Sequence, residues 1–119
     1  MKADIAKKWS DALRSGKYKQ SRGALHNNEG FCCLGVLCEL AIANGVALDV
    51  SPGTPKLPIT KYNETWYVLP RAVQEWSGAC TPGAVLDLSD GTMTLATYND
   101  TGHTFEQIAD IIDANVDKL

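Results

Sequence analysis

Six side chains have the residue types, and in part the chain order, of a papain-like cysteine hydrolase: Gln20, Cys32, Cys33, Asn99, Asp100 and His103. A cysteine near a helix N-terminus has a lowered thiol pKa and forms the nucleophilic thiolate more easily. In this hypothesis Cys32 or Cys33 attacks the substrate, and His103 acts as the base. Asn99 or Asp100 orients the imidazole, and Gln20 donates a hydrogen bond to the oxyanion.

The same residues also fit a purely structural interpretation. Residues 99–103 have the composition of a turn that precedes and caps the last helix, and no sequence pattern places His103 near either cysteine. The hydrolase is therefore the alternative hypothesis, and we expect no hydrolase activity.

Cysteine spacing argues against a metal site and against a disulfide framework. Cys32, Cys33 and Cys38 lie in or beside one apolar stretch, and Cys80 is remote in the sequence. The chain has two histidines and no Cys-x-x-Cys motif, whereas zinc sites use paired ligands at fixed spacing. We expect buried free thiols, no metal and no cofactor.

A second candidate site is the basic segment, residues 17–22, in which cations alternate with polar or aromatic side chains. Its candidate ligand-binding residues are Lys17, Tyr18, Lys19, Gln20 and Arg22. The cations suit a phosphate group, and the tyrosine suits stacking or a hydroxyl contact. The segment leads toward the N-terminus of the expected central helix, and helix N-termini attract anions. A solvated surface loop is the simpler interpretation of these residues.

Charge is strongly segregated along the chain. Residues 1–22 carry seven Lys or Arg side chains against two Asp, a net charge of +5, whereas the remainder carries four basic and twelve acidic side chains, a net charge of −8. A protein that binds duplex nucleic acid normally shows a broader basic surface. We therefore expect a small anion or a protein as the partner, and no duplex nucleic acid.

The elements that must position these residues are organised around an apolar stretch at residues 31–45. Glu39 is its only charged residue, so a helix formed here is buried and central. The stretch is too short to cross a bilayer, and we expect no membrane association. Its expected core positions are Leu34, Leu37, Cys38, Ala41 and Ile42, with Trp9, Ile108 and Ile112 packed around them.

Helical periodicity and the residues typical of helix ends predict further helices before and after this one in the sequence. We expect helices near residues 3–15, 33–44, 70–77 and 104–117, each supported by its apolar spacing or its flanking residues. Gly16, Gly45 and Gly78 suit the C-terminal ends of the first three. Thr104 and Gln107 fit a capping box at the start of the last.

The β-structure is predicted from turn signals and alternation. Asp90-Gly91 lies between alternating stretches at 85–88 and 92–96, which favours an antiparallel hairpin, and a shorter hairpin is expected before the central helix. Residues 65–68 are expected to form a strand, and 46–63 a surface loop with a Pro-rich part, residues 51–58. We expect Trp66, Tyr67 and Trp76 in the core, although neighbours on a strand face opposite sides, so one of the first two must face outward.

Together these elements predict one domain, residues 1–119, with an α+β fold. In it, a buried central helix packs on a small, mostly antiparallel sheet and is flanked by the N- and C-terminal helices. The first residues lack an apolar signal sequence, so the expected location is the cytoplasm.

Four ordered motifs resemble a family of small proteins encoded by tailed bacteriophages and prophages. They are W-x-x-A-L-R-S-G-x-Y-x-Q from Trp9, F-C-C-L-G-V-L-C from Phe31, L-P-x-x-V-x-x-W-x-G from Leu69 and N-D-x-G-x-T-F-x-x-I-A from Asn99. The resemblance implies an accessory protein that acts in the bacterial host cell and counters host defence or adjusts a host process. It assigns no role to any residue.

The sequence thus favours a non-enzymatic binding protein. Its expected ligand is an anionic host small molecule such as a nucleotide signal. The alternative partner is a host protein, which would contact the Pro-rich loop and an exposed Trp66 or Tyr67. The sequence does not decide between a monomer and a homo-oligomer.

Overall fold

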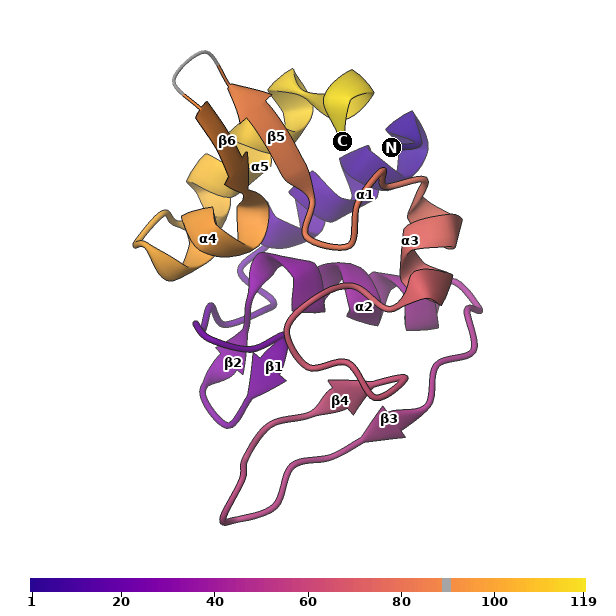
Figure 1. Ribbon diagram of the computed structural model, residues 1–119, viewed down its shortest axis with the longest axis vertical. Coiled ribbons are helices and arrows are strands. Elements are labelled where there is room, and N and C mark those ends of the chain that lie inside the picture. The colour runs from indigo at the N-terminus through magenta and orange to yellow at the C-terminus, as the bar shows by residue number, and fades with distance from the viewer. Residues whose placement is uncertain (89–90) are drawn as a thin grey trace.

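Helix α2 (Cys33–Ala43) lies at the centre of the computed structural model, which describes residues 1–88 and 91–119 (Figure 1). Helix α1 (Ala3–Arg14) packs on one side of it, and α5 (Phe105–Ala114) packs along α1. The shorter helices α3 (Arg71–Ser77) and α4 (Leu95–Asp100) also contact α2, and a short 3-10 turn, η1 (Val116–Lys118), follows α5. The predicted central helix, with terminal helices beside it, is confirmed.

The strands form three separate antiparallel pairs, so the fold is α+β as predicted. Strand β1 (His26–Asn27) pairs with β2 (Gly30–Phe31), β3 (Val50–Ser51) with β4 (Lys61–Tyr62), and β5 (Val85–Leu88) with β6 (Gly91–Thr94). The expected hairpins before α2 and around the Asp-Gly pair are both present as strand pairs. The predicted turn at Asp90 lies outside the described residues.

Isolated bridges widen the first strand pair on both sides. Gln20 bridges Phe31 in parallel orientation, and Asn27 bridges Ile59 in antiparallel orientation. The basic segment therefore runs alongside β2, and the end of the Pro-rich region runs alongside β1. The β3–β4 pair lies inside the stretch predicted to be loop only, so that prediction was wrong at residues 50–51 and 61–62.

The core is built around α2, in which residues 33–38 are all buried. Leu34, Leu37, Cys38 and Ala41 are fully buried, and Trp9, Ile108 and Ile112 belong to the same cluster, as predicted. The indole Nε1 of Trp9 also donates a hydrogen bond of 2.8 Å to the carbonyl oxygen of Cys33. Because Trp9 is completely buried, this bond satisfies a donor that water cannot reach.

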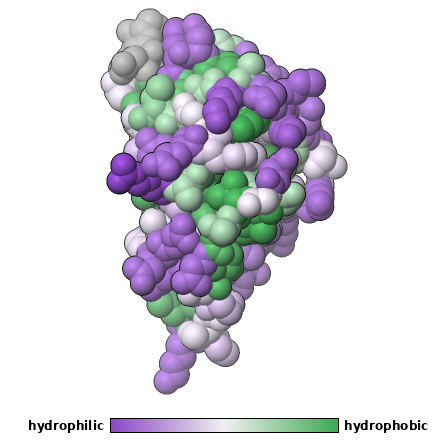
Figure 2. All heavy atoms as spheres, turned by 90° about the vertical axis from the view of Figure 1, so that its right-hand side faces the viewer, coloured by the Kyte–Doolittle hydropathy of each residue, from purple (hydrophilic) through white to green (hydrophobic). Residues whose placement is uncertain are grey.

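The prediction of a buried Ile42 was wrong, because 38% of its surface is exposed. One residue along a helix turns the side chain by about 100°, so Ile42 points away from the buried row that ends at Ala41. Figure 2 views the molecule from the side of α3, the right-hand side of Figure 1, and shows hydrophobic side chains (green) that reach the surface in the middle of that face. The core is thus covered only in part there.

Helix ends follow the predicted signals closely. Thr104 and Gln107 form the complete capping box of α5, with both side chains bonded to the other residue's backbone NH. Gly78 closes α3 with a φ of 75°, in the left-handed region. The predicted last helix ends earlier, at Ala114, and continues as the 3-10 turn.

Two local predictions were wrong. Residues 66–68 are bends and not a strand, and only Thr65 forms an isolated bridge, to Tyr62. Residues 95 and 96 begin helix α4 and do not continue β6, because the Thr94 hydroxyl caps the helix by accepting from the Thr97 NH. The predicted turn at 99–103 accordingly begins after Asp100. Within residues 1–88 and 91–119, none of the helices has the length and apolar character needed to cross a bilayer.

Candidate functional site

The basic segment presents three cations to solvent. Lys17, Lys19 and Arg22 are exposed, and none forms an ion pair within residues 1–88 and 91–119. The amino group of Lys17 lies 5.6 Å from the centre of the Tyr18 ring, a cation–π arrangement that leaves its positive charge uncompensated. Three uncompensated charges within six residues attract an anion.

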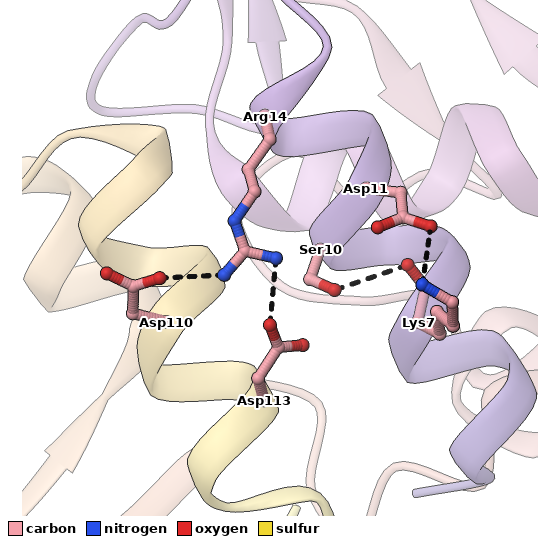
Figure 3. Close-up of polar contacts among 6 residues, drawn as sticks. All are labelled: Lys7, Ser10, Asp11, Arg14, Asp110 and Asp113. Atoms are coloured by element: carbon pink, nitrogen blue, oxygen red, sulfur yellow. Dashed lines mark hydrogen bonds and ion pairs between the residues drawn. The ribbon is translucent and has the colours of Figure 1, made fainter.

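The neighbouring arginine is not part of this site. Figure 3 shows Arg14 at the end of α1, pointing toward two carboxylates of α5. Its guanidinium nitrogens lie 2.7 Å from Asp110 Oδ1 and 2.8 Å from Asp113 Oδ2. Lys7 likewise pairs with Asp11, one helical turn away, at 3.2 Å. Among the described residues, the cations of the N-terminal region that have no ion pair are then Lys2 and Lys8 together with the three cations of the basic segment.

Tyr18 and Gln20 are less accessible to a ligand than the three cations are. Tyr18 is half-buried, and its ring meets that of Phe31 edge-on, with 5.4 Å between the ring centres. The Gln20 amide nitrogen donates to Asn99 Oδ1 at 2.9 Å and to the His103 carbonyl oxygen at 2.7 Å. Both of its hydrogens are therefore used, so Gln20 has no donor left for a ligand or an oxyanion.

Asn99 is the centre of this polar network and is completely buried. Its Oδ1 also accepts from the Cys33 backbone NH at 3.3 Å, and its Nδ2 donates to the Ser21 carbonyl oxygen at 2.7 Å. Asn99 thus ties the basic segment to the start of α2. Its Oδ1 accepts from the first backbone NH of α2, so this donor is used within the protein and is not open to a ligand anion.

The two candidate nucleophiles are enclosed in the core. Cys32 and Cys33 are buried, and Cys33 Sγ donates to the Leu95 carbonyl oxygen at 3.5 Å. Burial raises the pKa of the Cys32 thiol to about 11 and raises that of Cys33 well above its ordinary value. The helix N-terminus therefore does not produce the lowered thiol pKa that the hydrolase hypothesis needs.

The candidate base is held elsewhere. His103 Nδ1 lies 3.1 Å from the Tyr98 carbonyl oxygen, and its ring packs edge-on against the Tyr98 ring. In the part of the chain that the structure describes, no hydrogen bond joins the His103 ring to either thiol. The structure thus brings Gln20, Asn99 and Cys33 together, as the hypothesis required, but in a network without a nucleophile–base contact.

Thiol labelling follows from these environments. With iodoacetamide at neutral pH and mass-spectrometric mapping, we expect rapid labelling of the exposed Cys80 and very slow labelling of Cys32, Cys33 and Cys38. Only a thiolate reacts, and burial suppresses both ionisation and access. All four should react once the chain is unfolded in urea. Rapid labelling of Cys32 or Cys33 in the folded protein, lost in His103→Ala, would support the hydrolase instead.

Trp66 and Tyr67, of which one was predicted to lie in the core, are both exposed. Trp66 and Tyr67 expose 46% and 36% of their surface, whereas Trp76 is half-buried against the core. One of the first two was predicted to face outward, and both do, because residues 66–68 are bends, which do not alternate between a buried and an exposed face. Their rings contact each other edge-on, with 5.7 Å between the ring centres.

A hydrogen-bonded chain that sequence reasoning missed links Glu39, Tyr62 and His26. The Tyr62 hydroxyl donates to Glu39 Oε2 at 2.9 Å and lies 3.3 Å from His26 Nδ1. Because a tyrosine has one hydroxyl hydrogen, His26 Nδ1 must donate to Tyr62, and the neutral imidazole keeps its lone pair on Nε2. The one signal in the sequence was Glu39, since a lone charge in an apolar helix needs a polar partner.

The half-buried His26 makes the stability of the protein depend on pH. Burial lowers the pKa of His26 from its ordinary 6.5, with Glu39 opposing the shift. The unfolded chain therefore binds the proton at a higher pH than the folded one, so stability is full above about pH 6.5 and decreases as pH falls toward the folded pKa. We expect the urea midpoint to fall less between pH 7.5 and 5.5 in His26→Gln than in the wild type. If the urea midpoint changes with pH equally in both proteins, His26 does not contribute to the pH dependence of stability.

The fold and these contacts define a small α+β domain with an exposed basic segment beside its first hairpin. A family model described as "Domain of unknown function (DUF8296)" matches residues 1–116, and the chain belongs to this family. Comparisons with curated proteins and with solved structures found no match.

Proposed function

We propose that this chain is a non-enzymatic binding protein that holds an anionic small molecule of the nucleotide class on the basic segment. The observation that supports the proposal is the set of exposed cations at Lys17, Lys19 and Arg22, which have no carboxylate partner among the described residues. Lys7, Arg14 and Arg71 are paired with carboxylates, and the other lysines without an ion pair among the described residues are spread along the sequence, whereas these three cations lie within six residues. Charges left free in this way are suited to an external anion.

The backbone of the basic segment is held in place before any ligand binds. The Phe31 NH donates to the Lys19 carbonyl oxygen at 2.8 Å, and the Ser21 NH donates to the Phe31 carbonyl oxygen at 2.7 Å. Gly30 permits this approach, because a Cβ there would overlap the Lys19 carbonyl. A fixed backbone lowers the ordering cost of binding, which supports a binding role for the segment.

The cellular role belongs to the same proposal. The likeness to bacteriophage and prophage accessory proteins favours action in the cytoplasm of an infected bacterium. There, binding of a nucleotide signal would lower its free concentration and so weaken a host response. A host protein is the alternative partner, favoured by the exposed Trp66 and by Leu57 in the Pro-rich loop.

Thermal unfolding with a panel of mono-, di- and cyclic nucleotides tests the proposal. A ligand at 100 times its dissociation constant should stabilise the folded chain by about 2.7 kcal/mol. The variant Lys17→Ala/Lys19→Ala/Arg22→Ala should lose this stabilisation. The variant Lys56→Ala/Lys61→Ala/Lys118→Ala, which removes the same charge from other exposed positions, should retain it. If no anion stabilises the wild type, the small-molecule proposal is wrong and the protein partner is favoured.

A further inference from the structure

Trp66 and Tyr67 form an aromatic pair that is exposed to solvent. The next residue, Val68, is also 38% exposed, so three large apolar side chains in a row meet solvent. The two rings contact each other edge-on, at an angle of 61°. This contact stabilises the pair while leaving ring surface open to a further flat group.

Hydrogen bonds hold the aromatic pair beside the end of the basic segment. The Leu25 NH donates to the Trp66 carbonyl oxygen at 2.8 Å, so the chain between β4 and α3 passes next to β1 (Figure 1). The Tyr67 hydroxyl donates to Asp100 Oδ2 at 3.2 Å, and the Gly23 NH donates to Asp100 Oδ1 at 3.1 Å. One carboxylate therefore joins Tyr67 to the residue that follows Arg22.

The linking carboxylate of Asp100 does not neutralise the Arg22 guanidinium. Both oxygens of Asp100 accept hydrogen bonds from neutral donors, and no ion pair joins Asp100 to Arg22 within the described ranges 1–88 and 91–119. The Arg22 backbone is fixed in turn, since its carbonyl oxygen accepts from Asn27 Nδ2 at 3.1 Å. Among the described residues, the guanidinium of Arg22 thus has no ion pair, and its backbone is fixed one residue before the Gly23 NH that Asp100 links to Tyr67.

This combination of rings and cations selects among ligands. An inorganic anion would use the cations and leave the rings exposed, and an apolar partner surface would leave the cations unpaired. A nucleotide uses both, because its base has a π-face that stacks on aromatic side chains and its phosphates pair with Lys and Arg. We propose that Trp66 and Tyr67 form the stacking platform for the base of a nucleotide whose phosphates lie on Lys19 and Arg22. This inference rests on the proposed function and adds to it a binding site for the nucleotide base.

Tryptophan fluorescence tests the platform directly. The probes are adenosine and guanosine triphosphates, the cyclic dinucleotides of the same bases, and tripolyphosphate, which carries the phosphates without a base. Trp9 is buried and Trp76 half-buried, so a base that stacks on Trp66 should quench mainly the exposed indole. We expect quenching by at least one nucleotide and none by tripolyphosphate, with the quenching lost in Trp66→Phe and kept in Trp76→Phe.

Affinities measured by calorimetry separate the inference from the proposed function. Trp66→Ala should weaken binding of the quenching nucleotide roughly 5- to 150-fold and leave tripolyphosphate binding unchanged, whereas Trp66→Phe should restore most of the affinity. Circular dichroism checks that each variant is folded. If nucleotides and tripolyphosphate bind equally well, and Trp66→Ala changes neither, the platform is wrong and the proposed anion site remains. If neither binds the wild type, the proposed function fails and the platform fails with it.

Discussion

Gly35→Ala is expected to destabilise the fold by about 3 kcal/mol or more, the upper end of what overpacking costs. A Cβ at this position would overlap the carbonyl group of Leu25, which is backbone and cannot rotate away. The same carbonyl accepts a hydrogen bond of 3.1 Å from the Cys32 NH at the start of α2. Relief of the overlap would therefore move the hairpin away from α2 and break this bond.

The measurement is the urea unfolding midpoint, compared with that of Gly83→Ala. A Cβ at Gly83 would lie 3.5 Å from Thr94 Cγ2, an ordinary van der Waals distance, so this control should stay within about 0.5 kcal/mol of the wild type. If Gly35→Ala unfolds at the same urea concentration as the control, α2 does not approach Leu25 as closely as the structure shows.

Leu37→Ala should cost about 2–5 kcal/mol, because it removes buried methyl groups and leaves a cavity in the core. Leu37 is fully buried on α2, and the cluster around it includes residues of α1, α3, α4 and α5. Several elements would have to move together to fill the space, so the cavity should persist and the cost should be high within this range.

Ile42→Ala is the matched control, since it shortens an aliphatic side chain of the same helix at an exposed position. Its cost should be well below that of Leu37→Ala when both are measured by urea unfolding. Alanine also has the higher helix propensity, which offsets part of any loss. Equal costs for the two variants would mean that Leu37 and Ile42 do not differ in burial as the structure shows.

The candidate site was predictable in part. The alternation of cations in the basic segment is a local pattern, and the exposure of Lys17, Lys19 and Arg22 agrees with it. The role of Gln20 was not predictable, because its donors are used by Asn99 and His103, about 80 residues later. Side-chain hydrogen bonds of this kind depend on which segments the core brings together.

Local interactions determined the elements that the sequence alone could predict. The capping box at Thr104 closes within one helical turn, the apolar run of α2 requires burial wherever it packs, and the two alternating stretches near residues 85–96 contain strands β5 and β6, which pair with each other. Each of these signals is complete within about fifteen residues, so no knowledge of the rest of the chain is needed.

Tertiary structure decided what remained. Trp66 and Tyr67 are exposed because residues 66–68 are bends that form no strand, and Asn99 enters the start of α2 because α4 packs there. The Glu39–Tyr62–His26 chain likewise joins a helix and two strands. The physical reason is that a buried polar group must find a partner, but packing, and not sequence spacing, decides which partner is within reach.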